Sequence, residues 1–129
     1  MKILRQWLLG GLALSTAFYG NFAYSRIETG LDLLQQCAPV KKFIDNPNAV
    51  RSQREQFDAG VCVGYVEGVY DSMVMSDDIC PKSRPSSSTQ MARIVMEHAK
   101  NDLSLLDTYR VAIVGAAFLE AFPCADSAR

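Results

Sequence analysis

The chain has 129 residues, which is enough for one domain and not for two, and its formal net charge is −1. Residues 1–25 hold two of the 13 basic residues and none of the 14 acidic ones, so the other 104 residues carry a net charge of −3. Nucleic acids and anionic membrane surfaces require basic patches on their partners. The composition therefore argues against both as the main partner of this protein.

The N-terminus has the pattern of an export signal. Lys2 and Arg5 are basic, residues 7–19 are apolar and uncharged, and residues 23–25 form a small-x-small cleavage site. An apolar run of about 13 residues is shorter than the roughly 20 that a membrane-spanning helix needs. We therefore expect a signal peptide cleaved after residue 25, which leaves one domain at residues 26–129. An uncleaved membrane anchor is the alternative.

The first predicted helix begins after Thr29, which is suited to act as an N-cap with Asp32 as its capping-box partner. Apolar residues recur at helical spacing over Leu31–Ala38, and Pro39 is expected to end the helix. Residues 40–56 are polar and include an Asn-Pro-Asn triplet, so they predict a loop.

The second predicted helix spans residues 57–75. Its apolar stripe is Phe57, Val61, Tyr65, Val69 and Met73, widened by Cys62 and Val66. Gly60, Gly64 and Gly68 repeat every four residues along one side, and each costs roughly 1 kcal/mol relative to alanine in a helix interior. Close approach of another backbone would offset that cost. We therefore expect these glycines, with Tyr65, to form a helix-packing site inside the bundle. A ligand lodged against the bare backbone is the alternative.

The third predicted helix begins at Ser88 or Thr89, after a linker that starts at Cys80-Pro81. One apolar stripe is formed by residues at i, i+3, i+4 and i+7, namely Met91, Ile94, Val95 and His98. A histidine on such a stripe is more often a packing residue than a catalytic base. We interpret His98 as partly buried.

The last predicted helix runs from Asp107 or Thr108 to Phe122, and Pro123 ends it. No segment has the strict alternation of apolar and polar residues that a half-buried strand requires. The sequence therefore predicts an all-α protein, a small four-helix up-down bundle in one domain.

Four cysteines, all beyond the export signal, are best interpreted as two disulfides: Cys37, Cys62, Cys80 and Cys124. Thiolate zinc sites bring their ligands in close pairs, whereas the gaps here are 25, 18 and 44 residues. We therefore expect disulfide bonds, no bound metal and no cofactor.

Helix lengths favour one of the three possible pairings. From Cys62 to Met75 the helix is about 20 Å long, and the five residues that follow reach back at most about 18 Å. Bridged Cα atoms lie within about 7 Å, which disfavours Cys62–Cys80 and its complement. An up-down bundle favours Cys37–Cys62 with Cys80–Cys124. The pairing Cys37–Cys80 with Cys62–Cys124 stays open as the alternative.

Catalytic residues are not expected. His98 is the only histidine, and oxidised cysteines provide no nucleophile. Asp77-Asp78 lies at a helix end, where solvated acids are common, and Glu67 with Asp71 is an exposed i, i+4 pair on a helix. The glycines do not form a phosphate-binding loop. These features favour a binding protein over an enzyme.

Four segments carry a resemblance to a known family: Thr29 to Leu34 followed by Cys37, Cys62 to Gly68 (Cys-Val-Gly-Tyr-Val-Glu-Gly), Cys80-Pro81, and Ala117 to Cys124 (Ala-Phe-Leu-Glu-Ala-Phe-Pro-Cys). Each resembles a motif of the Rap/Tai immunity proteins of type VI secretion systems. The resemblance covers about residues 29–124.

This resemblance implies a small helical periplasmic protein. Such a protein binds and blocks a peptidoglycan amidase effector, acts as a homodimer and has no turnover. Polar loops that leave helix ends are suited to carry effector specificity, so we expect contacts from residues 77–88 and 100–107. The candidate effector-binding residues are Asp77, Asp78, Asn101, Asp102 and Ser104. A general periplasmic stress or chaperone-like protein, or an adaptor of an envelope complex, is the alternative function.

Overall fold

A computed structural model describes residues 28–125, and the expected signal peptide lies outside these residues. The described elements are α2 (Gly30–Asp45), α3 (Gln53–Met75), α4 (Ser88–Asn101), the short 3-10 helix η1 (Leu103–Asp107) and α5 (Arg110–Ala121). The predicted all-α fold with four α-helices is confirmed, because residues 28–125 contain no strand and only one isolated bridge, between Thr29 and Tyr109.

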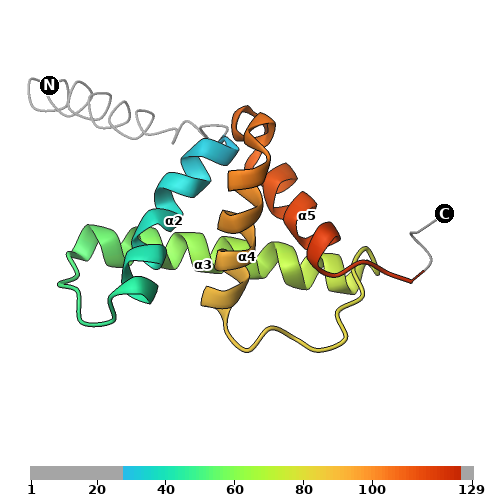
Figure 1. Cartoon of the computed structure of the whole chain (residues 1–129), viewed down its shortest axis with the longest axis horizontal. Coiled ribbons are helices and arrows are strands. Elements are labelled where there is room, and N and C mark those ends of the chain that lie inside the picture. The colour runs from blue at the N-terminus through green and yellow to red at the C-terminus, as the bar shows by residue number, and fades with distance from the viewer. Residues whose placement is uncertain (1–27, 126–129) are drawn as a thin grey trace, which may run out of the picture.

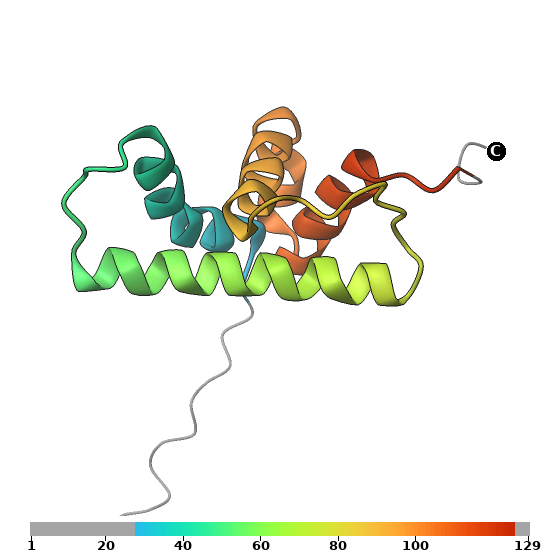
Figure 2. The same ribbon diagram turned by 90° about the horizontal axis from the view of Figure 1, so that it is seen from below.

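Helix α3 is the longest element, with 23 residues, and the other helices pack on one side of it. Figure 2 shows α3 along one edge of the molecule with α2, α4 and α5 together above it. In Figure 1 the three shorter helices cross α3 at steep angles. The molecule therefore has two layers, one of which is a single helix. No helix in the described part of the chain is long and apolar enough to cross a membrane.

Helix α2 begins where the sequence predicts. The Thr29 hydroxyl accepts a hydrogen bond from the Asp32 amide at 3.2 Å, and the Asp32 carboxylate accepts one from the Thr29 amide at 3.0 Å. The prediction that Pro39 ends this helix is wrong, because α2 continues to Asp45. Proline in a helix interior removes one hydrogen bond and costs about 3 kcal/mol. Burial of Val40 in the last turns of α2 offsets part of that cost.

The predicted loop is consequently shorter, at residues 46–52 rather than 40–56. Helix α3 begins early because Ser52 and Glu55 form a second capping box, in which the Ser52 amide donates to the Glu55 carboxylate at 2.9 Å. Lys42 pairs with Glu55 and joins the end of α2 to the start of α3. This Ser-x-x-Glu motif is a sequence signal for a helix start, but the polar composition of residues 40–56 led to the prediction of a loop.

The buried core lies between the two layers. It comprises Leu33, Cys37, Val40, Cys62, Val66, Tyr70, Ile79, Met91, Ala92, Val95, Ala99, Ile113, Val114, Ala117 and Phe118. Helix α3 contributes Cys62, Val66 and Tyr70, a repeat of four that is displaced from the predicted stripe. Phe57, placed on the inner face by its spacing, is 68% exposed. That part of the prediction is wrong because Phe57, nine residues before the buried Val66, lies on the opposite side of the helix, away from the core.

Both predicted disulfides are confirmed. Cys37 and Cys62 are fully buried, with Cα atoms 5.1 Å apart, and they join α2 to α3. Cys80 and Cys124 have Cα atoms 4.8 Å apart and join the linker after α3 to the segment after α5. The Cys80 amide also donates to the Phe122 carbonyl at 3.0 Å. The alternative pairing is thereby excluded.

Candidate functional site

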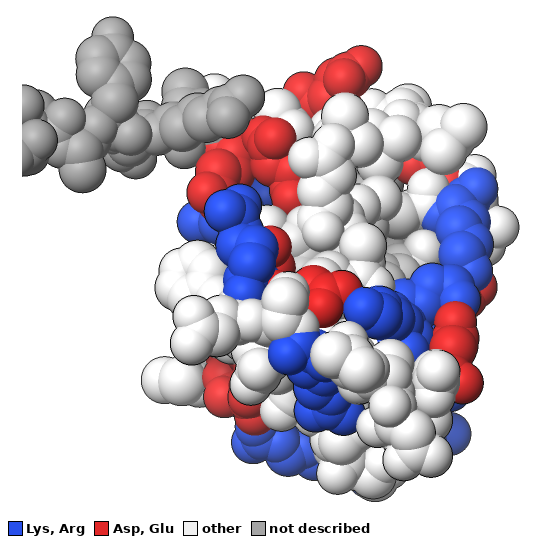
Figure 3. All heavy atoms as spheres, turned by 90° about the vertical axis from the view of Figure 1, so that its left-hand side faces the viewer, with Lys and Arg blue, Asp and Glu red and all other residues white. Residues whose placement is uncertain are grey.

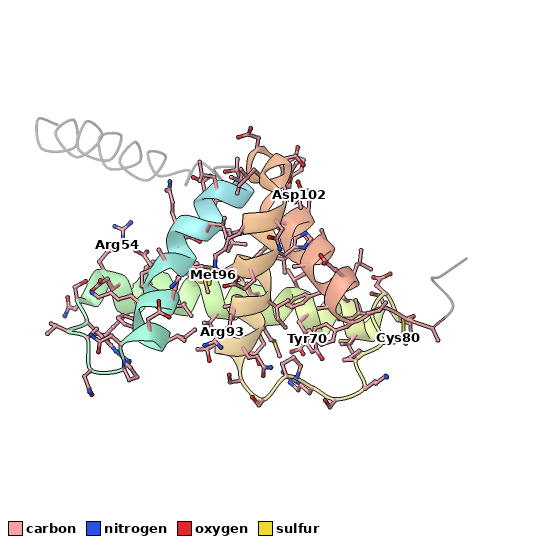
Figure 4. All side chains as sticks on the ribbon, in the orientation of Figure 1. Arg54, Tyr70, Cys80, Arg93, Met96 and Asp102 are labelled. Carbon is pink, nitrogen blue, oxygen red and sulfur yellow. A yellow bond between two sulfur atoms is a disulfide. The ribbon has the colours of Figure 1, made fainter. Side chains whose placement is uncertain are left out.

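The expected effector-binding residues lie at two separate ends of the molecule. Asp77 and Asp78 follow the end of α3, whereas Asn101, Asp102 and Ser104 follow the end of α4. Figure 4 shows Asp102 at the top of α4 and Cys80, beside the first group, near the far end of α3. The two groups therefore do not form one surface.

The Asp77-Asp78 turn is exposed and has a clear local role. Asp77 adopts the left-handed conformation with φ of 57°, which aspartate tolerates better than most residues. The Asp78 amide donates to the Met73 carbonyl at 2.9 Å, and the Asp78 carboxylate accepts from the Ser76 hydroxyl at 2.5 Å. These bonds end α3 and turn the chain into the linker.

The linker is held against α3 by ion pairs that the sequence did not reveal. Arg84 lies 3.0 Å from the Glu67 carboxylate and 3.3 Å from that of Asp71. The Ser88 hydroxyl also donates to Glu67 at 2.9 Å. The acidic pair on α3 is thus an anchor for the linker. No sequence signal identified Arg84, because its partners lie 17 and 13 residues away.

The second group forms a turn between α4 and η1. The Asp102 carboxylate accepts hydrogen bonds from the Ser104 amide at 3.1 Å and the Ser104 hydroxyl at 2.5 Å, and so caps η1. Asn101 is exposed beside this turn and lines a cleft between α4 and α5. Asn101 is therefore a predicted contact residue that lines a concave surface.

The α4–α5 cleft has a volume of about 470 Å³. Its floor includes the buried Ala117, and its rim carries charges of both signs. The lining residues are Gln90, Arg93, Ile94, Glu97, His98, Asn101, Ala117, Glu120 and Ala121. The α4 residues among them run from Gln90 to Asn101, so the cleft extends along most of this helix, on which Figure 4 labels Arg93. Its walls are two helices fixed by the core, which gives a rigid concave surface.

His98 and Glu120 join the two walls of the cleft. The His98 side chain is 15% exposed, as its interpretation as a partly buried residue requires, and its Nδ1 lies 2.6 Å from Glu120 Oε2. Its other ring nitrogen, Nε2, is buried and has no hydrogen-bond partner among the described atoms. The histidine is therefore not a simple apolar packing residue. Sequence spacing could not reveal Glu120 as its partner, because the two residues belong to different helices.

The charge at the opposite rim is stabilised locally. Lys100 donates to the Glu97 carboxylate at 2.7 Å, and this bond lowers the pKa of Glu97 below its usual value. Arg93 makes no salt bridge within residues 28–125. The rim thus presents the Glu97 carboxylate with Lys100 bonded to it and Arg93, which also lowers the pKa of Glu97, nearby.

The end of the molecule at the α2–α3 loop has a different character. Figure 3 shows basic and acidic side chains interspersed over this face. Three exposed ion pairs lie there: Lys41 with Asp45, Lys42 with Glu55, and Arg54 with Asp58. Such pairs contribute little to stability. Their alternation of sign also leaves no extended basic patch on this face.

The glycines of α3 do not pack as expected. A Cβ atom added at Gly60, Gly64 or Gly68 would meet no described atom within 4 Å, so the prediction that they contact another helix of the same chain is wrong. Gly30, in contrast, lies so close to η1 that its Cβ would come 2.6 Å from the Leu105 carbonyl oxygen. The repeat of glycines every four residues correctly predicts that they share one side of α3, but it does not show whether another element packs on that side.

Tyr65 lies at the edge of the same face and is partly buried against the core. The Arg110 guanidinium lies 4.1 Å from the centre of its ring, and burial raises the pKa of the phenol. Arg110 also pairs with Glu28 at the start of the described chain. Tyr65 therefore has the packing contacts that its neighbouring glycines lack.

The described part of the chain contains neither a candidate metal site nor a free thiol. No group of three or more His, Cys, Asp or Glu side chains there could hold a metal ion. All four cysteines are in disulfides.

Fold and surface together define a small, disulfide-braced helical domain with clefts suited to a protein partner. The chain belongs to the Rap1a immunity proteins, because the model of that family matches residues 29–124. The match begins at the Thr29 cap and ends at Cys124, so it includes the whole core and both disulfides. Membership indicates an immunity function against an effector. No curated protein and no solved structure matches the chain.

Proposed function

We propose that this protein is a periplasmic immunity protein that binds and blocks a type VI secretion peptidoglycan amidase, without turnover. The observation that supports this most is the family match over residues 29–124. The two disulfides fit an oxidising compartment such as the periplasm. The export-signal pattern of residues 1–25 supports the same location. The resemblance to immunity proteins implies a homodimer, and the proposal includes one.

The proposed effector contact is the α4–α5 cleft together with the adjoining turn at Asn101, Asp102 and Ser104. The cleft is concave and its walls are rigid helices, so little conformational entropy is lost when a partner binds. Its charged rim supplies directional contacts that can distinguish one effector from another. Asp77 and Asp78 lie away from this surface and are not part of the proposed contact.

A competition assay tests this function. A strain that lacks the gene is challenged by a sister strain that delivers the effector, with and without plasmid-borne wild-type protein. We expect survival only with the protein, and capture of a peptidoglycan amidase when the tagged protein is purified from the periplasm. Equal survival in both cases, with no hydrolase captured, would refute the proposal. That outcome would favour the chaperone-like or adaptor alternative.

A matched pair of variants tests the proposed contact surface. Arg93→Glu reverses a cation on the rim of the cleft, and Lys82→Glu reverses an exposed cation in the linker after α3; neither makes a salt bridge within residues 28–125. We expect Arg93→Glu to weaken binding to the captured amidase at least tenfold and Lys82→Glu to change it less than twofold. Equal effects of the two variants would place the contact elsewhere.

A further inference from the structure

The outward face of α3 is uncovered and mostly apolar, with the ion pair of Asp71 and Arg84 at its edge. Phe57 near its start is 68% exposed and Met75 at its end is 85% exposed. Between them the face carries Gly60, Gly64 and Gly68, all exposed. Figure 2 shows that α2, α4 and α5 lie on the opposite side of this helix. No described part of the chain covers this face.

The face continues onto α5. A groove of about 370 Å³ runs between the two helices, lined by Gly64, Tyr65, Gly68, Val69, Ser72, Met73, Val111 and Gly115. None of these residues is charged. Val111 and Leu119 are exposed beside the groove on α5. Contiguous apolar surface of this kind on an exported domain indicates a protein contact.

We propose that this face, the α3 face, is where a second copy of the chain docks, with the two α3 helices antiparallel across a two-fold axis. This inference rests on the homodimer included in the proposed function and assigns its interface. An antiparallel pairing centred beside Val66 places Gly64 opposite the partner's Gly68. The same register places Phe57 opposite the partner's Met75. A two-fold axis makes each contact occur twice, so a self-complementary face is what the symmetry requires.

The sizes of the side chains match this register. Glycines at the centre allow the two helix backbones to approach closely. At either end Phe57 meets a methionine, whose flexible thioether packs well on an aromatic ring. The three glycines weaken α3 as an isolated helix. The close contact therefore gives a reason for glycines that the fold of a single chain does not explain.

The charges at the two ends of α3 favour the same arrangement. Arg51 is exposed just before its start, whereas the neighbouring Arg54 is already paired with Asp58. Asp77 and Asp78 are exposed just beyond its end. Antiparallel pairing brings Arg51 of each copy toward these aspartates of the other, whereas parallel pairing would bring like charges together.

The area reaches that of a small specific interface. A helix of 23 residues is about 35 Å long and about 10 Å wide, which gives roughly 350 Å². With the adjoining strip of the 12-residue α5, the α3 face presents roughly 500 Å² on each copy, or roughly 1,000 Å² in all, the smallest area expected of a specific interface. The effector cleft lies between α4 and α5 and stays open in this arrangement.

Sedimentation equilibrium of the protein purified from the periplasm tests the interface. Phe57→Lys places a charge on the α3 face, and Leu103→Lys is its matched control, because Leu103 is also 68% exposed but lies on η1. We expect Phe57→Lys to raise the dimer dissociation constant at least tenfold and Leu103→Lys to change it less than twofold. Circular dichroism verifies that both variants fold. Equal effects would overturn the inference.

A cross-link tests the register. In the Phe57→Cys/Met75→Cys double variant the two new thiols lie about 27 Å apart along one helix, too far to bridge within a chain. We expect a covalent dimer whose non-reducing peptide map joins position 57 to position 75. A dimer without this cross-link would overturn the assigned interface and leave the homodimer intact. A monomeric wild-type protein would refute the homodimer itself, and loss of amidase binding in Phe57→Lys would assign the face to the effector instead.

Discussion

Removing each disulfide in turn provides a quantitative test of how this domain is stabilised. Closing a loop of 25 residues, as Cys37–Cys62 does, restricts the unfolded chain by about 3.5 kcal/mol, and a loop of 44 residues by about 4 kcal/mol. Loop entropy alone therefore predicts that the loss of Cys80–Cys124 is slightly more destabilising.

Burial reverses this order. Cys37 and Cys62 are fully buried at the α2–α3 contact, whereas Cys80 is exposed and Cys124 is partly exposed. Replacing two buried sulfurs with hydrogen leaves a cavity that costs about 2 kcal/mol more. We expect Cys37→Ala/Cys62→Ala to lose about 5–6 kcal/mol of unfolding free energy.

The Cys80→Ala/Cys124→Ala variant should lose about 4 kcal/mol, because its site is open to solvent and the hydrogen bond from the Cys80 amide is retained. Urea unfolding followed by circular dichroism gives both values. A domain of this size has about 5–15 kcal/mol in total, so the first variant should be close to unfolded at 25 °C. A larger loss in the second variant would contradict the role assigned to burial.

For three further substitutions the structure predicts whether the free energy of unfolding rises or falls. Gly30→Ala should destabilise by about 1–3 kcal/mol, because its Cβ meets the backbone of η1. Gly60→Ala should stabilise by up to about 1 kcal/mol, because its Cβ meets open space and alanine favours helix. Both are measured by urea unfolding, and a shared sign would contradict the assignment. Thr29→Ala removes a capping box and should cost about 1 kcal/mol by the same assay. The bonds of Glu55 to Lys42 and Ser52 lower its pKa from 4.5 to about 2. This lowered pKa stabilises the folded state above pH 4.5, and the contribution is lost as the pH falls toward 2. The difference in urea midpoint between wild type and Glu55→Gln should therefore shrink over that range, and a constant difference would exclude this linkage.

Local signals in the sequence account for much of the fold. The Thr29 capping box, the end of α3 and the four-helix composition depend on residues a few positions apart, and they are where the pattern indicates. The prediction at Pro39 was wrong because burial of Val40 and its neighbours, which no local pattern records, holds the helix together beyond the proline. Helix length and chain reach disfavoured one disulfide pairing, and the expected order of the helices favoured the observed pairing over the alternative that stayed open.

The candidate site was harder to predict from the sequence, because its residues are far apart along the chain. Asn101 was identified from its polar loop, but the cleft that it lines needs α5, and Glu120 meets His98 across 22 positions in sequence. Arg84 was missed for the same reason, because its partners lie on another element.

The sequence by itself determined the all-α class, the family resemblance and a row of glycines on one side of α3, and it favoured the observed disulfide pairing without excluding the alternative. Only the tertiary structure decided which way that row faces. Helical periodicity places residues on a common side of a helix but carries no information about which side the rest of the chain covers. With α2, α4 and α5 packed over Cys62, Val66 and Tyr70, the glycine side is left uncovered within residues 28–125.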